Sequence, residues 1–97
     1  MDLNDVDVVY LATPHHLHCE QTVMAAAADK HIIVEKPMAL SLAECDQMIE
    51  AAKKAKVHLL VGHTHSFNAP IRDMRKLIEH GAIGPVAMIN SWHFGAF

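Results

Sequence analysis

Apolar residues form three short, nearly continuous runs within the first 62 positions of the chain. The runs occupy residues 6–12, 31–34 and 57–62 and are rich in valine, isoleucine and leucine. Such runs are typical of strands that are covered on both faces. The first run ends at Thr13-Pro14 and Pro37 follows the second, and a proline cannot donate to a strand ladder. The pattern therefore predicts three short, buried strands.

The two stretches between these runs have the apolar spacing of helices. Residues 17–28 predict a first helix that ends at Asp29-Lys30. Its apolar stripe is Leu17, Val23, Met24 and Ala27. The second helix begins at Ser41, which forms the pattern of a capping box with Glu44. Its apolar stripe is Leu42, Cys45, Met48, Ile49 and Ala52.

The last third of the chain predicts one more helix and one more strand. After an irregular stretch, Asn68 can cap a third helix with Pro70 in its first turn, where the missing N–H costs nothing. Gly81 is placed to end this helix. Its buried stripe is Ile71, Met74, Leu77 and Ile78. A turn at Gly84-Pro85 leads into residues 86–93, where alternating apolar residues predict a fourth strand.

The order of these elements, β-α-β-α-β-α-β, predicts an α/β fold with a partial Rossmann-like parallel sheet and flanking helices. Short helical crossovers return the chain to the same end of a sheet, so the first three strands are expected to be parallel. In open sheets of this kind, ligands bind beyond the carboxyl ends of the strands. We therefore expect residues 13–18, 35–38 and 62–68 to lie along one edge.

Composition and charge narrow the class of protein. The 97 residues are 52% hydrophobic and 20% charged, which is typical of a globular chain. Eight basic residues against 11 acidic ones give a net charge of -3, so neither nucleic acid nor an anionic membrane is expected as a partner. No apolar run approaches the roughly 20 residues that span a bilayer. We expect a cytoplasmic protein in which Cys19 and Cys45 are reduced packing residues.

Lys36 carries the clearest candidate chemistry on the predicted edge. It directly follows a buried strand, with Glu35 before it and Pro37 after it. A lysine in this place can donate a hydrogen bond to a substrate or ribose hydroxyl and, if partly buried, can share a proton with it. The alternative is a surface lysine that pairs with Glu35 before a turn. The spacing alone leaves both interpretations open.

The turn after the first strand is a second candidate. Thr13, Pro14 and His15 offer amides and a hydroxyl that could meet a diphosphate or a ribose. Ala-Thr-Pro is also a common way to leave a strand, so the turn can equally be structural.

Histidines are unusually frequent, with nine in the chain. Two groups lie on the predicted edge, with His15, His16, His18 and Cys19 in one and His63 and His65 in the other. Imidazole and thiolate can bind zinc or iron. However, the adjacent His15 and His16 cannot easily face one ion, and no carboxylate is placed to orient them. We therefore expect no bound metal, and single histidines that orient a ligand or transfer a proton.

Three blocks of residues resemble the Gfo/Idh/MocA oxidoreductases, which are named for glucose-fructose oxidoreductase and inositol dehydrogenase. The blocks are residues 8–14 with His18 four positions on, then Val34-Glu35-Lys36-Pro37, then Leu60-Val61-Gly62. The resemblance implies an NAD(P)-binding Rossmann domain followed by an α/β domain that binds substrate and mediates oligomers.

The resemblance also implies roles for individual residues. Thr13, Pro14 and His18 would line the dinucleotide site, and Glu35 would contact the cofactor mainly through its backbone. Lys36 would touch the nicotinamide end and the reacting hydroxyl, as the catalytic residue. Together with His15 and Pro37, these residues form the predicted site for NAD or NADP.

The loop at residues 63–68 departs from the arginine-containing version that is common in the family. It resembles members that act on aromatic dihydrodiols or hydroxylated phthalates. His63 or His65 would then face an acidic or polyhydroxylated substrate. A merely polar loop between domains fits the same residues.

The family's glycine-rich turn belongs to a first half-domain that would precede Met1. We therefore expect a fragment, in which residues 1–68 are the C-terminal half of the dinucleotide-binding domain. Residues 69–97 would be a linking helix and the first strand of the substrate domain. The expected reaction is hydride transfer between nicotinamide and a hydroxyl-bearing small molecule of the sugar, cyclitol or dihydrodiol type, with the isolated chain inactive.

Two other classes of function fit the sequence. One is a non-catalytic module that self-associates, because a bare edge strand recruits another chain. This edge also favours a homo-oligomer, a dimer or larger. The other is a histidine-rich metal-binding protein.

Overall fold

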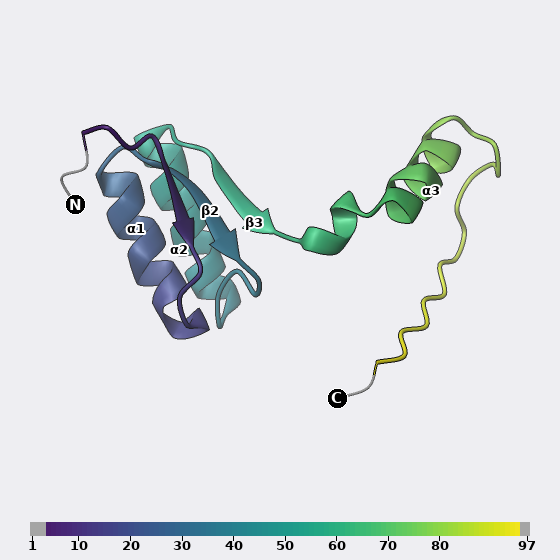
Figure 1. Ribbon diagram of the computed structural model, residues 1–97, viewed down its shortest axis with the longest axis horizontal. Helices are drawn as coiled ribbons and strands as arrows, with labels where there is room; N and C mark the ends of the chain where they lie inside the picture. Colours follow the sequence, from purple (N-terminus) through teal and green to yellow (C-terminus); the bar gives the residue numbers. More distant parts are fainter. Residues whose placement is uncertain (1–3, 96–97) are drawn as a thin grey trace. The chain divides into compact units, whose positions relative to one another are not determined.

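A computed structural model describes residues 4–95 of the chain (Figure 1). Two compact units are present, one up to His63 and the other from Thr64 onward, and each is described by itself. The first contains β1 (Val8–Leu11), the 3-10 helix η1 (His15–Leu17), α1 (His18–Ala27), β2 (His31–Glu35), α2 (Leu42–Ala55) and β3 (Leu59–Gly62). The second contains the 3-10 helix η2 (Thr64–Phe67) and α3 (Ala69–Glu79).

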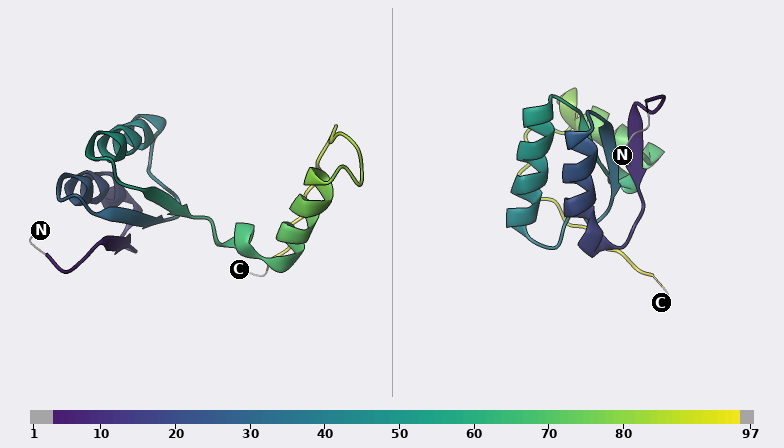
Figure 2. Two further views of the ribbon diagram at one scale, coloured as in Figure 1. Left: turned by 90° about the horizontal axis from the view of Figure 1, so that it is seen from above. Right: turned by 90° about the vertical axis from the view of Figure 1, so that its left-hand side faces the viewer.

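The three strands form one parallel sheet in the order β1-β2-β3. Leu11 lies opposite Val34, and Glu35 lies opposite Gly62. Figure 2 shows α1 and α2 side by side on the same face of the sheet, where α1 packs against both α2 and β2. The parallel sheet with flanking helices is therefore confirmed.

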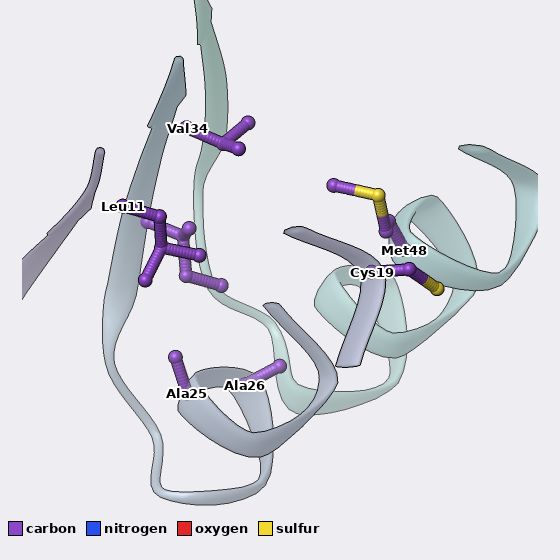
Figure 3. Close-up of a cluster of buried hydrophobic side chains, with 7 residues drawn as sticks. Leu11, Cys19, Ala25, Ala26, Val34 and Met48 are labelled. Carbon is purple, nitrogen blue, oxygen red and sulfur yellow. The ribbon is translucent and has the colours of Figure 1, made fainter. Parts of the chain in front are cut away.

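The core lies between the sheet and the two helices (Figure 3). Its buried members are Leu11, Cys19, Ala25, Ala26, Ile32, Val34 and Met48. Alternate residues of a strand point to opposite faces, so Ile32 and Val34 face the helices while Ile33 between them faces away. Both cysteines are free thiols on helices, with Cys19 buried and Cys45 half-buried.

The other side of the sheet, which we call the open face, carries Val8, Tyr10, Ile33 and Leu60. Tyr10, Ile33 and Leu60 lie in one row across the three strands. Val8, Tyr10 and Leu60 are each about half exposed, at 49%, 57% and 51%. The expectation of strands covered on both faces is therefore wrong for residues 4–95, because both helices lie on one side.

The buried face of α1 also differs from the predicted stripe. The helix buries His18, Cys19, Thr22, Ala25 and Ala26, whereas Met24 is 51% exposed. Small side chains at positions 25 and 26 allow α1 to approach the sheet closely, which a stripe containing methionine would prevent. The predicted stripe of α1 is therefore wrong, because the buried face of the helix is rotated away from Met24.

The capping box of α2 is present in a shifted form. The Ser41 hydroxyl accepts from the Glu44 amide at 3.2 Å, as predicted. The Glu44 carboxylate accepts from the Leu40 amide at 2.9 Å, one residue before the cap. Met48 and Ala52 are buried as expected, but Leu42 is 84% exposed.

In the second unit, α3 follows Asn68 and has Pro70 in its first turn, as predicted. Gly81 follows the helix with a φ of 73°, in the left-handed region that glycine adopts readily. However, Ile71, Met74 and Leu77 are exposed, because α3 has little beside η2 to pack against within this unit.

The predicted fourth strand is wrong. Residues 86–93 form neither helix nor strand. A strand requires hydrogen bonds to a neighbour, and no segment between residues 4 and 95 pairs with this one.

Candidate functional site

The carboxyl ends of the three strands meet at one edge, because the sheet is parallel. The loop after β1 begins this edge with Thr13 and Pro14. The loop after β2 adds Lys36 and Pro37, which are joined by a cis peptide bond. Since Gly62 pairs with Glu35, His63 follows β3 directly beside the end of β2.

Glu35 is held by two hydrogen bonds on the open face. The Tyr10 hydroxyl donates to Oε1 of Glu35, and the Lys36 amide donates to Oε2 at 3.2 Å. The Tyr10 bond, followed by that of the Lys36 amide, lowers the pKa of the Glu35 carboxyl. The same Tyr10–Glu35 bond raises the pKa of the Tyr10 hydroxyl. The pair is therefore a neutral phenol bound to a carboxylate.

The Lys36 side chain is exposed at the end of β2. The ion pairs found in residues 4–95 are Lys53–Glu50, Arg75–Glu79 and Lys76–Asp73, all on helix surfaces. No ion pair between Lys36 and Glu35 is among them, although the Lys36 charge is one of the causes that lower the pKa of the Glu35 carboxyl. The Glu35 oxygens are bound by Tyr10 and by a backbone amide, which leaves the Lys36 ammonium available to a ligand.

Thr13 is oriented by a glutamine from α1. Its hydroxyl donates to Oε1 of Gln21 at 2.6 Å. The hydroxyl oxygen can still accept, because its lone pairs are not used by this bond. Gln21 was not among the predicted site residues. Gln21 belongs to no recognisable motif, and Tyr10 lies in the first family block without an assigned role, so only the three-dimensional contacts reveal what the two side chains do.

His18 lies inside the protein, with no exposed surface. Its Nε2 is 3.0 Å from the carbonyl oxygen of Thr13, and its Nδ1 is 2.9 Å from that of Pro37. His15 is exposed on η1, with its ring edge-on to His18 at 5.8 Å between centroids.

The two histidines predicted to face a substrate are in different units. His63 is exposed at the end of β3, and its amide donates to the Val61 carbonyl at 2.9 Å. His65 belongs to η2, where its Nδ1 lies 3.3 Å from the Asn68 amide nitrogen. Within residues 4–95, no three His, Cys, Asp or Glu side chains are grouped to hold a metal ion. No helix in that range is long and apolar enough to cross a membrane.

The sheet, its edge and the ordered Glu35-Lys36-Pro37 segment define a dinucleotide-binding α/β domain, and comparison with known proteins agrees. Residues 1–63 match the family model described as the Gfo/Idh/MocA oxidoreductase family with an NAD-binding Rossmann fold. The chain belongs to this family, so the resemblance drawn from the sequence is confirmed.

Several relatives are dehydrogenases of ring compounds. The chain is 44% identical over 93 residues to the 1-carboxy-3-chloro-3,4-dihydroxycyclo hexa-1,5-diene dehydrogenase of Comamonas testosteroni, covering 96% of this chain and 23% of that protein. It is 38% identical over 80 residues to the myo-inositol 2-dehydrogenase of Thermotoga maritima, covering 82% and 24%. The chain thus spans about a quarter of the length of the curated relatives it matches.

A solved structure shares the fold. Levoglucosan dehydrogenase in complex with NADH and levoglucosan superposes with a TM-score of 0.82 and 41% identity, over 86% of this chain and 22% of that one.

Proposed function

We propose that this chain supplies the nicotinamide end of the cofactor site in an NAD(P)-dependent oxidoreductase. The observation that supports this proposal most strongly is the state of Lys36. Its ammonium stands exposed at the carboxyl end of β2, while the neighbouring carboxylate is bound by Tyr10 and a backbone amide. A lysine in this position can reach a ligand.

The residues of the edge fit a nicotinamide cofactor. Thr13 offers a hydroxyl oxygen that can accept from an amide or a ribose hydroxyl, since its hydrogen is directed to Gln21. Pro14 and Pro37 offer exposed, rigid surfaces beside it. Thr13, Pro14, Lys36 and Pro37 would hold the cofactor, which supplies the acceptor or donor of hydride. Both NAD and NADP fit these residues.

Lys36 would transfer the proton of the reaction. In the oxidative direction, the Lys36 ammonium first releases a proton to solvent, and the resulting amine accepts the proton of the substrate hydroxyl as the carbon loses hydride. In the reductive direction, the Lys36 ammonium returns that proton to the carbonyl oxygen. Glu35 would fix the backbone of Lys36 through its bond to the Lys36 amide.

The proposed substrate is a ring compound with neighbouring hydroxyls, of the sugar, cyclitol or dihydrodiol type. The names of the relatives support this class, since they include a dihydroxycyclohexadiene carboxylate, an inositol and levoglucosan. His63, exposed beside the end of β2, would contact such a substrate. His65 would do so if η2 approaches the edge in the whole protein.

The proposal is tested with the whole protein that contains this chain. Titration with NADH and with NADPH should quench protein fluorescence to saturation for at least one of them. Incubation with oxidised cofactor and a panel of inositols, anhydrosugars and cis-dihydrodiols should produce reduced nicotinamide, seen by its absorbance. A protein that binds neither cofactor and reduces neither with any of these compounds would disprove the proposed function.

A further inference from the structure

His18 joins the two loops that form the edge of the site. Its ring lies between the carbonyl of Thr13, at 3.0 Å from Nε2, and the carbonyl of Pro37, at 2.9 Å from Nδ1. The first carbonyl belongs to the loop after β1 and the second to the loop after β2. These strands are parallel neighbours, so a single side chain bridges two adjacent loops.

Both partners of the ring can only accept hydrogen bonds. A neutral imidazole has one N–H and one lone pair, so it can donate to only one carbonyl and must set its lone pair against the other. The imidazolium donates to both. The Glu35 carboxylate lies within electrostatic reach of the His18 ring and can balance its positive charge. His15 and Cys19 are its other titratable neighbours on η1 and α1.

We propose that His18 is a positioning residue, whose ring donates from both nitrogens and locks the Thr13 loop to the Lys36–Pro37 loop. It does not touch cofactor or substrate, because it is fully buried and both ring nitrogens are engaged. Its effect reaches Lys36 through the backbone. The lock on the loops stands on its own geometry, and only its importance for catalysis rests on the proposed function.

Hydrogen exchange of the 97-residue chain tests the lock without any cofactor. The Leu17 amide reports the first loop, since it donates to Pro14, and the Lys36 amide reports the second. His18→Leu should speed exchange at both amides roughly tenfold, because each loop loses about one hydrogen bond. The Ile32 amide in β2 is the internal reference and should not change. Unchanged loops, or equal acceleration at Ile32, would overturn the proposal.

Two conservative variants separate the two halves of the lock. The amide nitrogen of asparagine lies near the place of Nδ1, and that of glutamine near the place of Nε2. His18→Asn should therefore keep Lys36 protected and release Leu17, whereas His18→Gln should do the reverse. A side chain that only filled space would give the same exchange pattern in both variants, and that result would contradict the lock.

The unmodified chain gives an independent readout. Nitrogen-15 spectra of the His18 ring should show a proton on both nitrogens, because each faces a carbonyl oxygen. A single protonated nitrogen would disprove the two-carbonyl lock, whatever the variants do. These measurements can succeed even if the whole protein proves not to be an oxidoreductase, so failure of the lock and failure of the proposed function remain distinguishable.

Discussion

Thr22 offers a test of how α1 packs beneath the site. It lies one helical turn after His18, on the same face of α1, and is fully buried. Its hydroxyl has no hydrogen-bond partner among residues 4–95. Leaving a buried hydroxyl unpaired costs about 1–3 kcal/mol. Valine has nearly the same shape and a similar helix propensity, so Thr22→Val removes this cost and little else.

We expect Thr22→Val to raise the free energy of unfolding by about 1 kcal/mol, at the lower end of that range. For a chain of this size, such a gain raises the melting temperature by roughly 4–8 °C. Urea and thermal denaturation followed by circular dichroism measure both quantities. Thr22→Ser is the matched control, because it keeps the hydroxyl and removes a buried methyl, and it should cost about 1 kcal/mol. A less stable Thr22→Val chain would show that the hydroxyl is paired.

Three further predictions concern other parts of the first unit. Burial raises the pKa of the Cys19 thiol, so iodoacetamide near neutral pH should modify Cys45 before Cys19. Mass spectrometry of the labelled peptides measures both rates, and equal rates would contradict the packing of α1. The Glu35 carboxyl has a lower pKa in the folded chain than when unfolded, so its stabilising effect is present above the unfolded pKa and disappears as the pH falls through the folded value. Tyr10→Phe removes the largest cause of this shift. In urea titrations, the variant should therefore lose less stability than the parent chain between neutral and acidic pH. An identical loss would mean that the Tyr10–Glu35 hydrogen bond is not made. The exposed apolar side chains of the open face should drive self-association, visible as a dimer by light scattering. Leu60→Lys should weaken this dimer, and a parent chain that stays monomeric at high concentration would refute the prediction.

The sequence predicted the bounds of those elements that depend on local residue patterns. The first two apolar runs ended within one residue of the ends of β1 and β2, and Ser41 and Glu44 marked the start of α2. The strand predicted at 86–93 failed because alternation alone cannot supply a partner strand.

The interior of the site depends on contacts that no local pattern contains. The resemblance implies that His18 lines the cofactor site, but it does not give the partners of the ring. These are carbonyls five and 19 residues away, and backbone atoms leave no signature in a sequence. The bond between Tyr10 and Glu35 joins residues 25 apart and depends on the register of β1 against β2. The placement of Lys36 at a strand end could be predicted, because strand ends follow from the apolar runs. The contacts that hold Lys36 in this place could not be predicted.

The rate of hydride transfer in a Lys36 variant tests the central claim most directly. Single-turnover kinetics of the whole protein, with cofactor and substrate both saturating, should show Lys36→Ala slowed by about 10²–10⁴-fold, the usual contribution of a proton-transferring side chain. Cofactor affinity should change far less, and Lys54→Ala, an exposed lysine on α2, should leave the rate unchanged. A Lys36→Ala protein that transfers hydride at the full rate would contradict the assigned role.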